Sequence, residues 1–328
     1  MPLVSVVVPT YNRLAQLKRT LAGLERQQFP REQFEVVVVS DGSTDGTDAY
    51  LRELRTPYEL RFVAQPNTGP ASARNTAIRN ARGDYILFID DDIVAAPHLI
   101  AEHMRLHHAE QNLVVLGPML SPDDYRLSSW VAWEQAMLMK QYTAMQEGHW
   151  EPTARQFYTG NTSVARSHLI EAGGFDERFR RAEDVELAYR LRQRGVRFVF
   201  QPEAIVYHYA DRSFRSWLEI PYAYGRNDVI FSRERETWIL QTMQREFGER
   251  NALTRFIVHT CLDRGIASRA VQAALKQVAN LSYQLGSETI SRAALSAIFN
   301  LRYYQGVADE LGGRNAFFGA MRPIISTS

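Results

Sequence analysis

Cysteine is nearly absent from the 328-residue chain, which contains only Cys261. A single thiol excludes an intrachain disulfide framework and a cysteine-rich zinc module, and it is consistent with a reducing compartment. Long apolar runs are also missing, since none approaches the roughly 20 residues that a membrane-spanning helix needs. Any membrane contact is therefore expected to be peripheral.

An excess of charge of either sign is lacking as well. The chain has 38 Lys and Arg against 37 Asp and Glu, for a formal net charge of +1. Nucleic-acid-binding domains usually carry a strongly basic face, so no nucleic-acid partner is expected. The N-terminus has neither the basic start nor the small-residue cleavage site of a signal peptide. We expect a cytoplasmic protein, with a peripheral position at the inner face of the membrane as an open alternative.

Strands and helices alternate through the first two thirds of the chain. Residues 4–8 and 36–39 are β-branched runs typical of buried parallel strands, and between them leucines recur at helical spacing. Further strands are predicted at residues 60–64, 85–89, 113–116, 196–200 and 204–208. This alternation predicts an α/β fold with a Rossmann-like, mostly parallel sheet flanked by helices.

The pattern changes to helices alone from about residue 213, with helices predicted at residues 256–285 and 291–311 and breaks at Gly225 and Gly286. We therefore expect a catalytic domain over residues 1–212 and a helical region over 213–328. The helical region mixes aromatic and basic residues: Arg302, Tyr303, Tyr304, Phe317, Phe318 and Arg322. This mixture is compatible with a lipid surface, although packing on the first domain or homodimerisation is the preferred interpretation.

Adjacent carboxylates follow the strand predicted at residues 85–89. Asp90, Asp91 and Asp92 repel one another unless a cation holds them. In an extended chain, Asp90 and Asp92 would face one way and Asp91 the other. Carboxylates without Cys or His favour Mg²⁺ or Mn²⁺, and Mg²⁺ typically completes its shell with phosphate oxygens. The cluster predicts a metal-bound phosphate ester, and a solvated turn or a helix cap is the alternative.

Polar loops follow three of the predicted strands, at residues 10–12, 40–42 and 90–92. Ligands of open α/β sheets bind outside the carboxyl ends of strands, where the strand order reverses. If the order reverses between the first and fourth strands, these loops converge on one crevice, which predicts a nucleotide site. Helix capping by Asn12, Thr44 and Asp45 is an alternative that is compatible with this role.

Six sequence segments, taken in order, resemble the family-2 inverting glycosyltransferases, which have the nucleotide-diphospho-sugar transferase (GT-A type) fold. The resemblance runs from Val4 to about His208, and Tyr224-Gly225-Arg226 looks like a motif of some members. The segments are Val6-Val7-Val8-Pro9-Thr10-Tyr11-Asn12, Val39-Ser40-Asp41-Gly42-Ser43-Thr44-Asp45, Asn67-Thr68-Gly69-Pro70-Ala71-Ser72-Ala73-Arg74-Asn75, Phe88-Ile89-Asp90-Asp91-Asp92, Gly174-Phe175-Asp176, and Glu183-Asp184-Val185-Glu186-Leu187 with Arg190-Leu191.

The resemblance implies a set of nucleotide-binding residues. Thr10 and Tyr11 would flank the nucleobase, within the loop that also holds Pro9 and Asn12. Asp41 would hydrogen-bond the edge of the base, and Arg74 would lie near the base or the phosphates. The remaining nucleotide-binding residues are Asp90 and Asp91, of which Asp91 matches the variable middle position and is expected to be exposed.

The resemblance also implies metal and catalytic residues. Asp92 is the first choice as metal ligand, Asp90 would hold ribose or metal, and His208 either reaches the metal or phosphate or is simply packed. Glu183 and Asp184 match the acidic pair that carries the base, and Asp184 is preferred. A helix N-terminus favours an ionised carboxylate, as do nearby Arg180 and Arg181, so the proton affinity of Asp184 is expected to be low unless a closed site excludes water.

Residues 158–163 are interpreted as a loop and strand that line the crevice, and their place before the acidic helix puts Gly160, Asn161 and Thr162 on the acceptor side. The acceptor itself is expected to be a saccharide or a lipid-linked compound, selected by residues 121–155 and the C-terminal helices. The expected donor is a UDP sugar, with GDP and dTDP sugars as alternatives. Transfer would be a single displacement that inverts the anomeric carbon, assisted by Mg²⁺ or Mn²⁺.

Three other interpretations compete with a glycosyltransferase. Asp90, Asp92 and Val94 fit the Asp-x-Asp-x-Val pattern of haloacid-dehalogenase phosphatases, but that motif normally follows the first strand. A sugar nucleotidyltransferase shares the fold, but the loop after the first strand lacks a Gly-rich basic cradle for a triphosphate. A non-catalytic sugar-nucleotide binder would bind nucleotide with metal and transfer no sugar.

Overall fold

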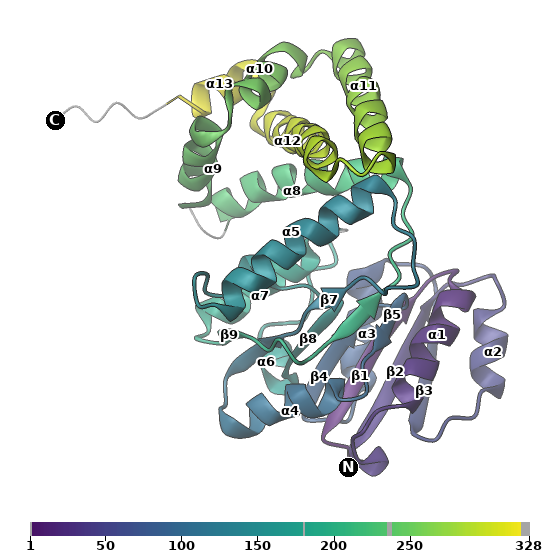
Figure 1. Cartoon of the computed structure of the whole chain (residues 1–328). Coiled ribbons are helices and arrows are strands. Elements are labelled where there is room, and N and C mark those ends of the chain that lie inside the picture. Colours follow the sequence, from purple (N-terminus) through teal and green to yellow (C-terminus); the bar gives the residue numbers. More distant parts are fainter. Residues whose placement is uncertain (1, 180, 235–237, 323–328) are drawn as a thin grey trace. The chain divides into compact units, whose positions relative to one another are not determined.

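A computed structural model describes residues 2–179, 181–234 and 238–322 of the chain (Figure 1). The chain separates into two compact units. The first comprises Met1–Arg126 and Met137–Ala210, and the second comprises Leu127–Ala136 and Asp211–Ser328. The functional division at residue 212 stays a prediction. No helix within the described ranges is both long enough and apolar enough to cross a membrane.

The first unit is built on a seven-stranded sheet in the order β3-β2-β1-β4-β8-β6-β9. Both β2 and β4 pair in parallel with β1, so the strand order reverses at the β1/β4 junction, while β8 runs antiparallel to its neighbours. The predicted mostly parallel sheet is confirmed. Its strands are β1 (Val4–Thr10), β2 (Phe34–Asp41), β3 (Glu59–Gln65), β4 (Tyr85–Ile89), β6 (Leu113–Leu116), β8 (Asn161–Ala165) and β9 (Arg197–Phe200).

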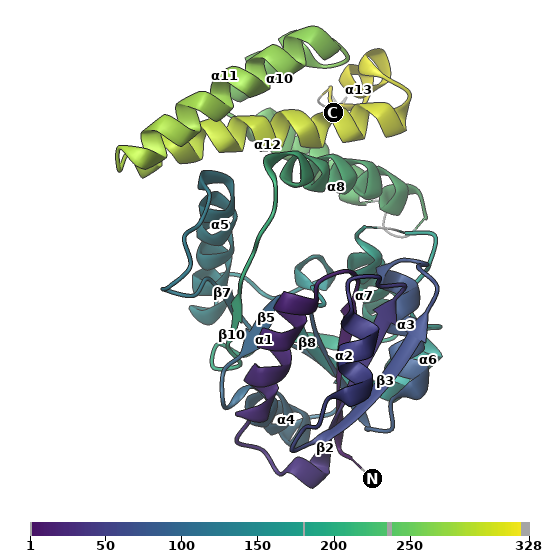
Figure 2. The same cartoon turned by 90° about the vertical axis from the view of Figure 1, so that its right-hand side faces the viewer.

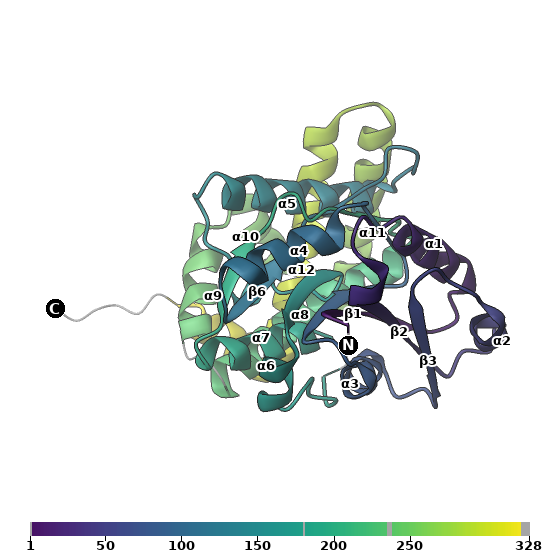
Figure 3. The ribbon, with the colours of Figure 1, turned by 90° about the horizontal axis from the view of Figure 1, so that it is seen from below.

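Helices cover both faces of this sheet. Seen from below, α1 (Leu14–Glu25) and α4 (Leu99–Ala109) lie on one side, and α3 (Pro70–Asn80) and α6 (Arg166–Glu171) lie on the other (Figure 3). Alternate valines of β1 and β2 pack with the leucines of α1 in one buried core, as the sequence periodicity predicted. The unit also contains α2 (Thr47–Glu53), α7 (Glu183–Gln193) and the short 3₁₀ helices η1 (Arg31–Gln33) and η2 (Ala154–Gln156).

A second, three-stranded sheet has the order β5-β10-β7, formed by Ile93–Ala95, Val206–His208 and Met119–Leu120. Strand β10 pairs antiparallel with β5, and His208 lies opposite Ile93. This register places His208 beside the acidic turn that ends β4.

The second unit is helical and is organised around α12 (Glu288–Leu311). The other helices are α8 (Phe214–Glu234), α9 (Trp238–Glu249), α10 (Ala252–Cys261), α11 (Gly265–Gln284) and α13 (Arg314–Ala320), and α5 (Ser129–Gln146) contributes residues to both units. Helix α11 lies along α12 (Figure 2).

Two expectations about the helical region were wrong. Gly225 does not break a helix but lies inside α8, where an added Cβ would collide with the carbonyl oxygen of Tyr303, and at Gly306 it would collide with that of Tyr222. These glycines let the backbones of α8 and α12 approach closely. The single helix expected over 256–285 is divided into α10 and α11, because Asp263 between them is in the left-handed conformation with φ 57°.

Candidate active site

The acidic cluster lies in a tight turn at the carboxyl end of β4 rather than in an extended chain. Asp90 accepts a hydrogen bond from Arg74, while Asp91 and Asp92 are bridged by Arg13 Nη1 at 3.2 and 2.7 Å. The turn therefore brings Asp91 and Asp92 to one guanidinium and Asp90 to another. The expectation of alternating sides was wrong because the turn breaks the period of two.

Asp91 is buried, with 5% of its surface exposed, so the expectation that it is the exposed residue was wrong. Its carboxylate accepts a hydrogen bond from the Thr10 hydroxyl at 2.7 Å, and its backbone oxygen accepts one from Thr20. Burial raises the pKa of Asp91 to about 6, against the opposing effects of Arg13 and Thr10. Asp91 holds the turn against β1 and α1, and Asp90 is the more open carboxylate, with a side chain that is 39% exposed.

The loops after β1 and β2 are tied to each other by polar side chains. Asn12 is in the left-handed conformation, and its side-chain oxygen accepts a hydrogen bond from the Thr44 backbone N–H at 2.7 Å. Its own backbone N–H donates to Ser43, and Asp45 accepts from the Leu14 N–H at 2.9 Å. Together with the Thr10–Asp91 contact, these bonds join all three predicted loops. The predicted convergence is thus seen in the structure.

The other three residues of the first nucleotide loop differ in exposure. Pro9 lies within β1 opposite Val39 of β2, and Thr10 is buried. Tyr11 is 50% exposed beside them. An exposed aromatic ring at the carboxyl end of a strand is available to stack on a base.

Asp41 is buried at the carboxyl end of β2, and its carboxylate already has several partners. It accepts hydrogen bonds from Gln65 Nε2 at 2.7 Å, from the Thr68 N–H at 3.0 Å and from the Gly69 N–H at 2.8 Å. These bonds fold the loop after β3 towards β2. Asp41 thus organises the wall of the crevice, and its contact with a nucleobase stays a prediction.

Arg74 links the acidic turn to the acidic helix. Its Nη2 lies 2.9 Å from Asp90 Oδ1, and its Nη1 lies 2.8 Å from Glu183 Oε1. The Arg74 side chain is only 7% exposed, and its Nε has no hydrogen-bond partner among the described residues. A buried guanidinium N–H without a partner is costly, so this atom is suited to an anionic ligand.

Asp184 follows Glu183 at the start of α7 and differs from it in its partners. Glu183 is buried against Arg74, whereas Asp184 is half-buried and accepts a hydrogen bond from the Val185 N–H. Burial and the charge of Glu183 raise the pKa of Asp184 to about 7, although Arg74 opposes the shift. This direction is opposite to the one expected for an open helix N-terminus, and burial, the condition under which a higher proton affinity was expected, is its largest cause. Arg180, which was expected to contribute, lies outside the described residues.

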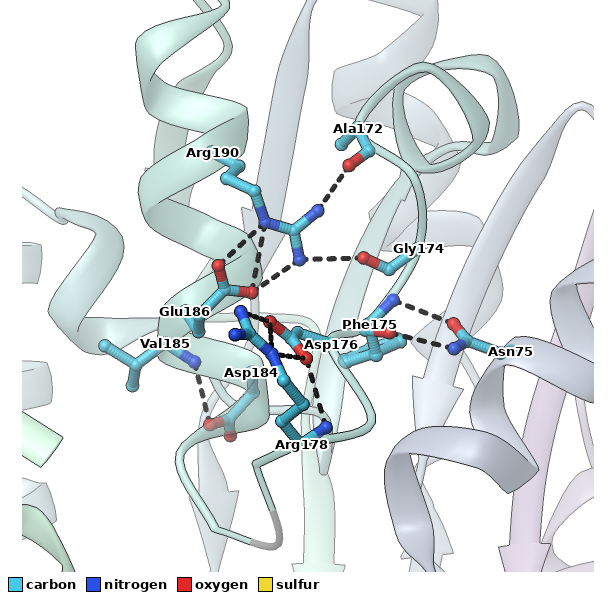
Figure 4. Close-up of polar contacts among 10 residues, drawn as sticks. All are labelled: Asn75, Ala172, Gly174, Phe175, Asp176, Arg178, Asp184, Val185, Glu186 and Arg190. Carbon is cyan, nitrogen blue, oxygen red and sulfur yellow. Dashed lines mark hydrogen bonds and ion pairs between the residues drawn. The ribbon is translucent and has the colours of Figure 1, made fainter. Parts of the chain in front are cut away.

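Three polar side chains hold the turn that precedes the acidic helix (Figure 4). Arg190 of α7 pairs with Glu186 and donates to the carbonyl oxygens of Ala172 and Gly174. From α3, the Asn75 amide accepts from the Phe175 N–H at 2.7 Å and donates to the Phe175 carbonyl at 2.9 Å. This network fixes the path of the chain into Glu183 and Asp184.

Asp92 and His208 form a pair of oxygen and nitrogen donors. His208 Nε2 lies 3.4 Å from Asp92 Oδ1. Burial alone would raise the pKa of Asp92, but His208 and Arg13 lower it to about 2, so the carboxylate is ionised at neutral pH. Among residues 2–179, 181–234 and 238–322 there is no group of three His, Cys, Asp or Glu side chains that could hold a metal. The donor set fits a divalent ion only if phosphate oxygens supply most of its ligands, as is usual for Mg²⁺.

The acceptor-side residues are not brought together as expected. Asn161 and Thr162 belong to β8 in the middle of the sheet, fully buried, and their side chains bond internally to Pro118, Ala204 and Tyr158. Their side chains therefore cannot face an acceptor. Only Gly160 borders the site, since a Cβ at this position would lie 3.5 Å from Asp90 Oδ2 and would collide with Met119.

A model of Glycosyl transferase family 2 matches residues 5–172, just over half of the chain and most of the site described above. The chain belongs to this family. It is 31% identical over 252 residues to the uncharacterized glycosyltransferase YfnE of Bacillus subtilis, covering 62% of this chain and 64% of YfnE. It is 35% identical over 221 residues to the validoxylamine A glucosyltransferase of Streptomyces hygroscopicus subsp. jinggangensis, covering 60% and 52%. The matches thus span between half and two thirds of these relatives.

Solved structures of similar fold include two glycosyltransferases. The mannosyltransferase PcManGT from Pyrobaculum calidifontis, in complex with GDP-Man and Mn²⁺, has a TM-score of 0.59 at 21% identity and covers 90% of this chain and 86% of that one. TarS 1-349 of S. aureus, in complex with UDP-GlcNAc, has a TM-score of 0.55 at 19% identity and covers 90% and 91%. At these identities the likeness shows the GT-A type fold alone.

Two features of this family-2 site were not found by sequence reasoning. Arg13 immediately follows the predicted nucleotide loop, and its position was the signal that could have found it. The Glu186–Arg190 pair has the i,i+4 spacing of a helical ion pair, which sequence patterns do show. Its contact with the turn at residues 172–174 depends on long-range packing and could not be predicted.

Proposed function

We propose that this family-2 protein is a metal-dependent inverting glycosyltransferase that moves a sugar from a nucleoside-diphosphate donor to an acceptor hydroxyl. The observation that carries the proposal is the chain of contacts from Asp90 through Arg74 to Glu183, with Asp184 beside it. It joins the loop that would hold the donor to the helix that would activate the acceptor. A buried Arg74 Nε without a partner fits a phosphate oxygen between them.

Asp184 would act as the general base. Burial and the charge of Glu183 raise the pKa of Asp184, which makes its carboxylate a stronger base for the proton of the acceptor hydroxyl than an exposed carboxylate would be. The acceptor oxygen then forms a bond to the anomeric carbon as the bond from that carbon to the diphosphate oxygen breaks. One displacement inverts the carbon, and no covalent intermediate with the enzyme is needed.

Glu183 and Arg74 would position the reacting groups. Glu183 accepts from Arg74 Nη1 and so holds the guanidinium towards the crevice. Arg74 and Arg13 would offset negative charge on the departing diphosphate. A divalent ion held at Asp92, with His208 and Asp90 as further candidate ligands, supplies additional charge neutralisation at the diphosphate when it is bound.

The donor is proposed to be a UDP sugar, because UDP and UDP-GlcNAc occur in complexes of a protein with this fold. GDP and dTDP sugars are the alternatives, and GDP-Man is bound in another neighbour of the same fold. Tyr11 would stack on the base and Asp41 would contact its edge. The acceptor is proposed to be a saccharide or lipid-linked hydroxyl.

The test is a thermal-shift panel of UDP, GDP, dTDP and CDP with and without Mn²⁺, followed by a transfer assay with the sugar of the stabilising nucleotide. We expect one nucleoside diphosphate to raise the melting temperature only when metal is present. In the transfer assay, the corresponding sugar nucleotide should release that diphosphate, and the anomeric carbon of the transferred sugar should be inverted. Binding without transfer or hydrolysis would instead indicate a non-catalytic binder. Phosphate release from simple phosphomonoesters would indicate a phosphatase.

A further inference from the structure

Helices α10 and α11 of the second unit expose several large apolar side chains. Phe256 of α10 is 64% exposed, Ile266 of α11 is 81% exposed, and Leu285 at the end of α11 is 75% exposed. Single exposed apolar residues are ordinary, but several on consecutive helices form the kind of patch that marks an interaction site.

The exposed apolar residues of α11 lie along one stripe. Ile266, Ala270, Ala274, Leu281 and Leu285 are exposed and separated by three or four residues or by multiples of a helical turn. Such spacing places them on one face of a helix. They form an apolar stripe along α11, which the exposed Gln277 and Gln284 interrupt.

The opposite face of α11 is the one that packs on α12. Its buried residues are Ser268, Gln272 and Ala279, and Ala279 shares a core with Leu295 and Ile298 of α12. On a helical projection these positions lie well over 90° from the exposed stripe. The stripe therefore faces away from α12, and its large apolar side chains are exposed among the described residues of the chain.

The charge within these two helices has one sign, and the exposed Glu288 that follows α11 is paired with Arg292. Neither α10 nor α11 contains an Asp or a Glu, whereas Arg255, Arg264 and Arg269 are exposed. The acid between the helices, Asp263, accepts hydrogen bonds from Gln305 and Arg314 and so points to α12 and α13. Lys276 lies over the Phe214 ring and is turned inward. The exposed surface is apolar and cationic.

We propose that the outer face of α10 and α11 docks on an anionic membrane surface. This α10–α11 face consists of Leu253, Arg255, Phe256, Arg264, Ile266, Arg269, Leu281 and Leu285. Apolar side chains that enter the lipid boundary, flanked by arginines that meet anionic headgroups, are the chemistry by which a helix lies in the interface plane. A second copy of the chain fits less well, because a symmetric contact would bring the arginines of this face together, and neither α10 nor α11 has a carboxylate to oppose them.

The proposal goes beyond sugar transfer and replaces an expectation from the sequence. Tyr304 and Phe317, which were expected to be lipid-facing candidates, are buried inside the helical unit, whereas Phe256 and Ile266 are exposed. Vesicle binding requires neither donor nor acceptor. Its failure would leave the proposed transferase untouched, and loss of transfer would leave vesicle binding intact.

The experiment is flotation of the full chain with vesicles of phosphatidylcholine alone or with added phosphatidylglycerol. We expect binding to the anionic vesicles that weakens as salt rises. The triple variant Phe256→Ser/Ile266→Ser/Leu285→Ser should lower the partition coefficient by about tenfold or more. The double variant Arg255→Gln/Arg269→Gln should lower binding to anionic vesicles by roughly tenfold and leave binding to neutral vesicles unchanged.

Matched variants of the first unit serve as controls. Ile170→Ser removes an apolar side chain that is 54% exposed on α6, and Arg31→Gln/Arg126→Gln removes two exposed charges. Both controls should float like the wild type. The proposal is overturned if anionic vesicles bind no better than neutral ones, or if the controls lose as much binding. It is also overturned if sedimentation shows a dimer that the triple variant dissociates, since the face would then be a self-interface.

Discussion

The acidic turn after β4 and the acidic start of α7 both place a carboxylate beside Arg74, yet Asp92 of the turn and Asp184 of the helix differ in their pKa values. In the turn, His208 and Arg13 overcome the effect of burial and lower the pKa of Asp92 to about 2. At α7, burial and Glu183 raise the pKa of Asp184 to about 7. A carboxylate that stays ionised is suited to a cation, and one that titrates near neutrality is suited to a proton.

The difference arises from where the cationic side chains lie. In the acidic turn, Arg13 contacts Asp92 directly, and His208 lies on its other oxygen. At α7, the guanidinium of Arg74 forms its ion pair with Glu183. Its charge lowers the pKa of Asp184 only from a longer distance, without a hydrogen bond. Both residues are aspartates, so it is the charged side chains around them that make Asp92 a candidate metal ligand and Asp184 a candidate base.

Asp184→Asn should have the largest effect, because it removes the proposed base and keeps the shape of the side chain. We expect transfer to fall by roughly 10² to 10⁴ while donor binding and folding are retained. Steady-state transfer rates and donor titrations measure the two effects separately. Glu183→Gln is the comparison: if it abolishes transfer while Asp184→Asn remains active, the base is Glu183.

Asp92→Ala should remove the metal dependence of nucleotide binding. We expect the affinity for the nucleoside diphosphate in Mn²⁺ to fall by about 10- to 100-fold, the range typical of disturbed metal sites. Calorimetric titrations with Mn²⁺ and with a chelator should then give nearly the same affinity for the variant. An unchanged Mn²⁺ response would show that Asp92 is not the ligand and that the two acidic segments do not divide their roles as proposed.

Asp41→Ala tests whether the Asp41 side chain forms a hydrogen bond with the edge of the nucleobase. Loss of a hydrogen bond to a buried base edge should cost about 1 to 3 kcal/mol in binding of the nucleoside, which carries no phosphate. Since Asp41 also holds Thr68 and Gly69, circular dichroism melts of the variant must accompany the titration. If the variant changes only the dependence of binding on metal, the loop after β2 does not contact the nucleobase.

The sequence predicted the sheet and the convergence of its loops, because β-branched runs and polar strand ends are local signals. It correctly placed His208 next to the acid cluster only through family resemblance, since the β10–β5 register is a long-range feature. It failed at Asn161 and Thr162, which were expected to line the crevice on the acceptor side and are instead buried in β8. The burial of Asn161 is stabilised by His103 and by the backbone carbonyls of Pro118 and Ala204, which are far away in sequence.

The pKa of Asp184 could not be predicted for a related reason. A helix N-terminus is visible in the sequence and lowers the pKa of a carboxyl. Burial beside Glu183 depends on the turn held by Asn75 and the Glu186–Arg190 pair, which forms only in the folded chain. Packing therefore reverses a shift that local rules predict.

The raised pKa of Asp184 also predicts a pH-dependent cost in stability. The folded value of about 7 exceeds the ordinary value of 3.8, so the group's stabilising contribution is complete below about pH 4 and is lost as pH rises through about 7. Asp184→Asn should therefore melt at a higher temperature than the wild type at pH 8. Below about pH 4 the two melting temperatures should be nearly equal, and a constant difference between this pH and pH 8 would contradict the shift.

Arg13→Gln should have the smallest effect and tests the cation that distinguishes the acidic turn. Arg13 Nη1 lies 2.7 Å from Asp92 and 3.2 Å from Asp91, but the arginine side chain is 42% exposed, so solvent screens the ion pair. Because the guanidinium and a metal compete for the same carboxylate, the variant should bind Mn²⁺ a few-fold more tightly when no nucleotide is present. Titration of Mn²⁺ followed by electron paramagnetic resonance measures this directly, with Arg31→Gln as the control. Weaker Mn²⁺ binding would mean that Arg13 organises the turn instead of competing, and that metal and arginine act together on Asp92.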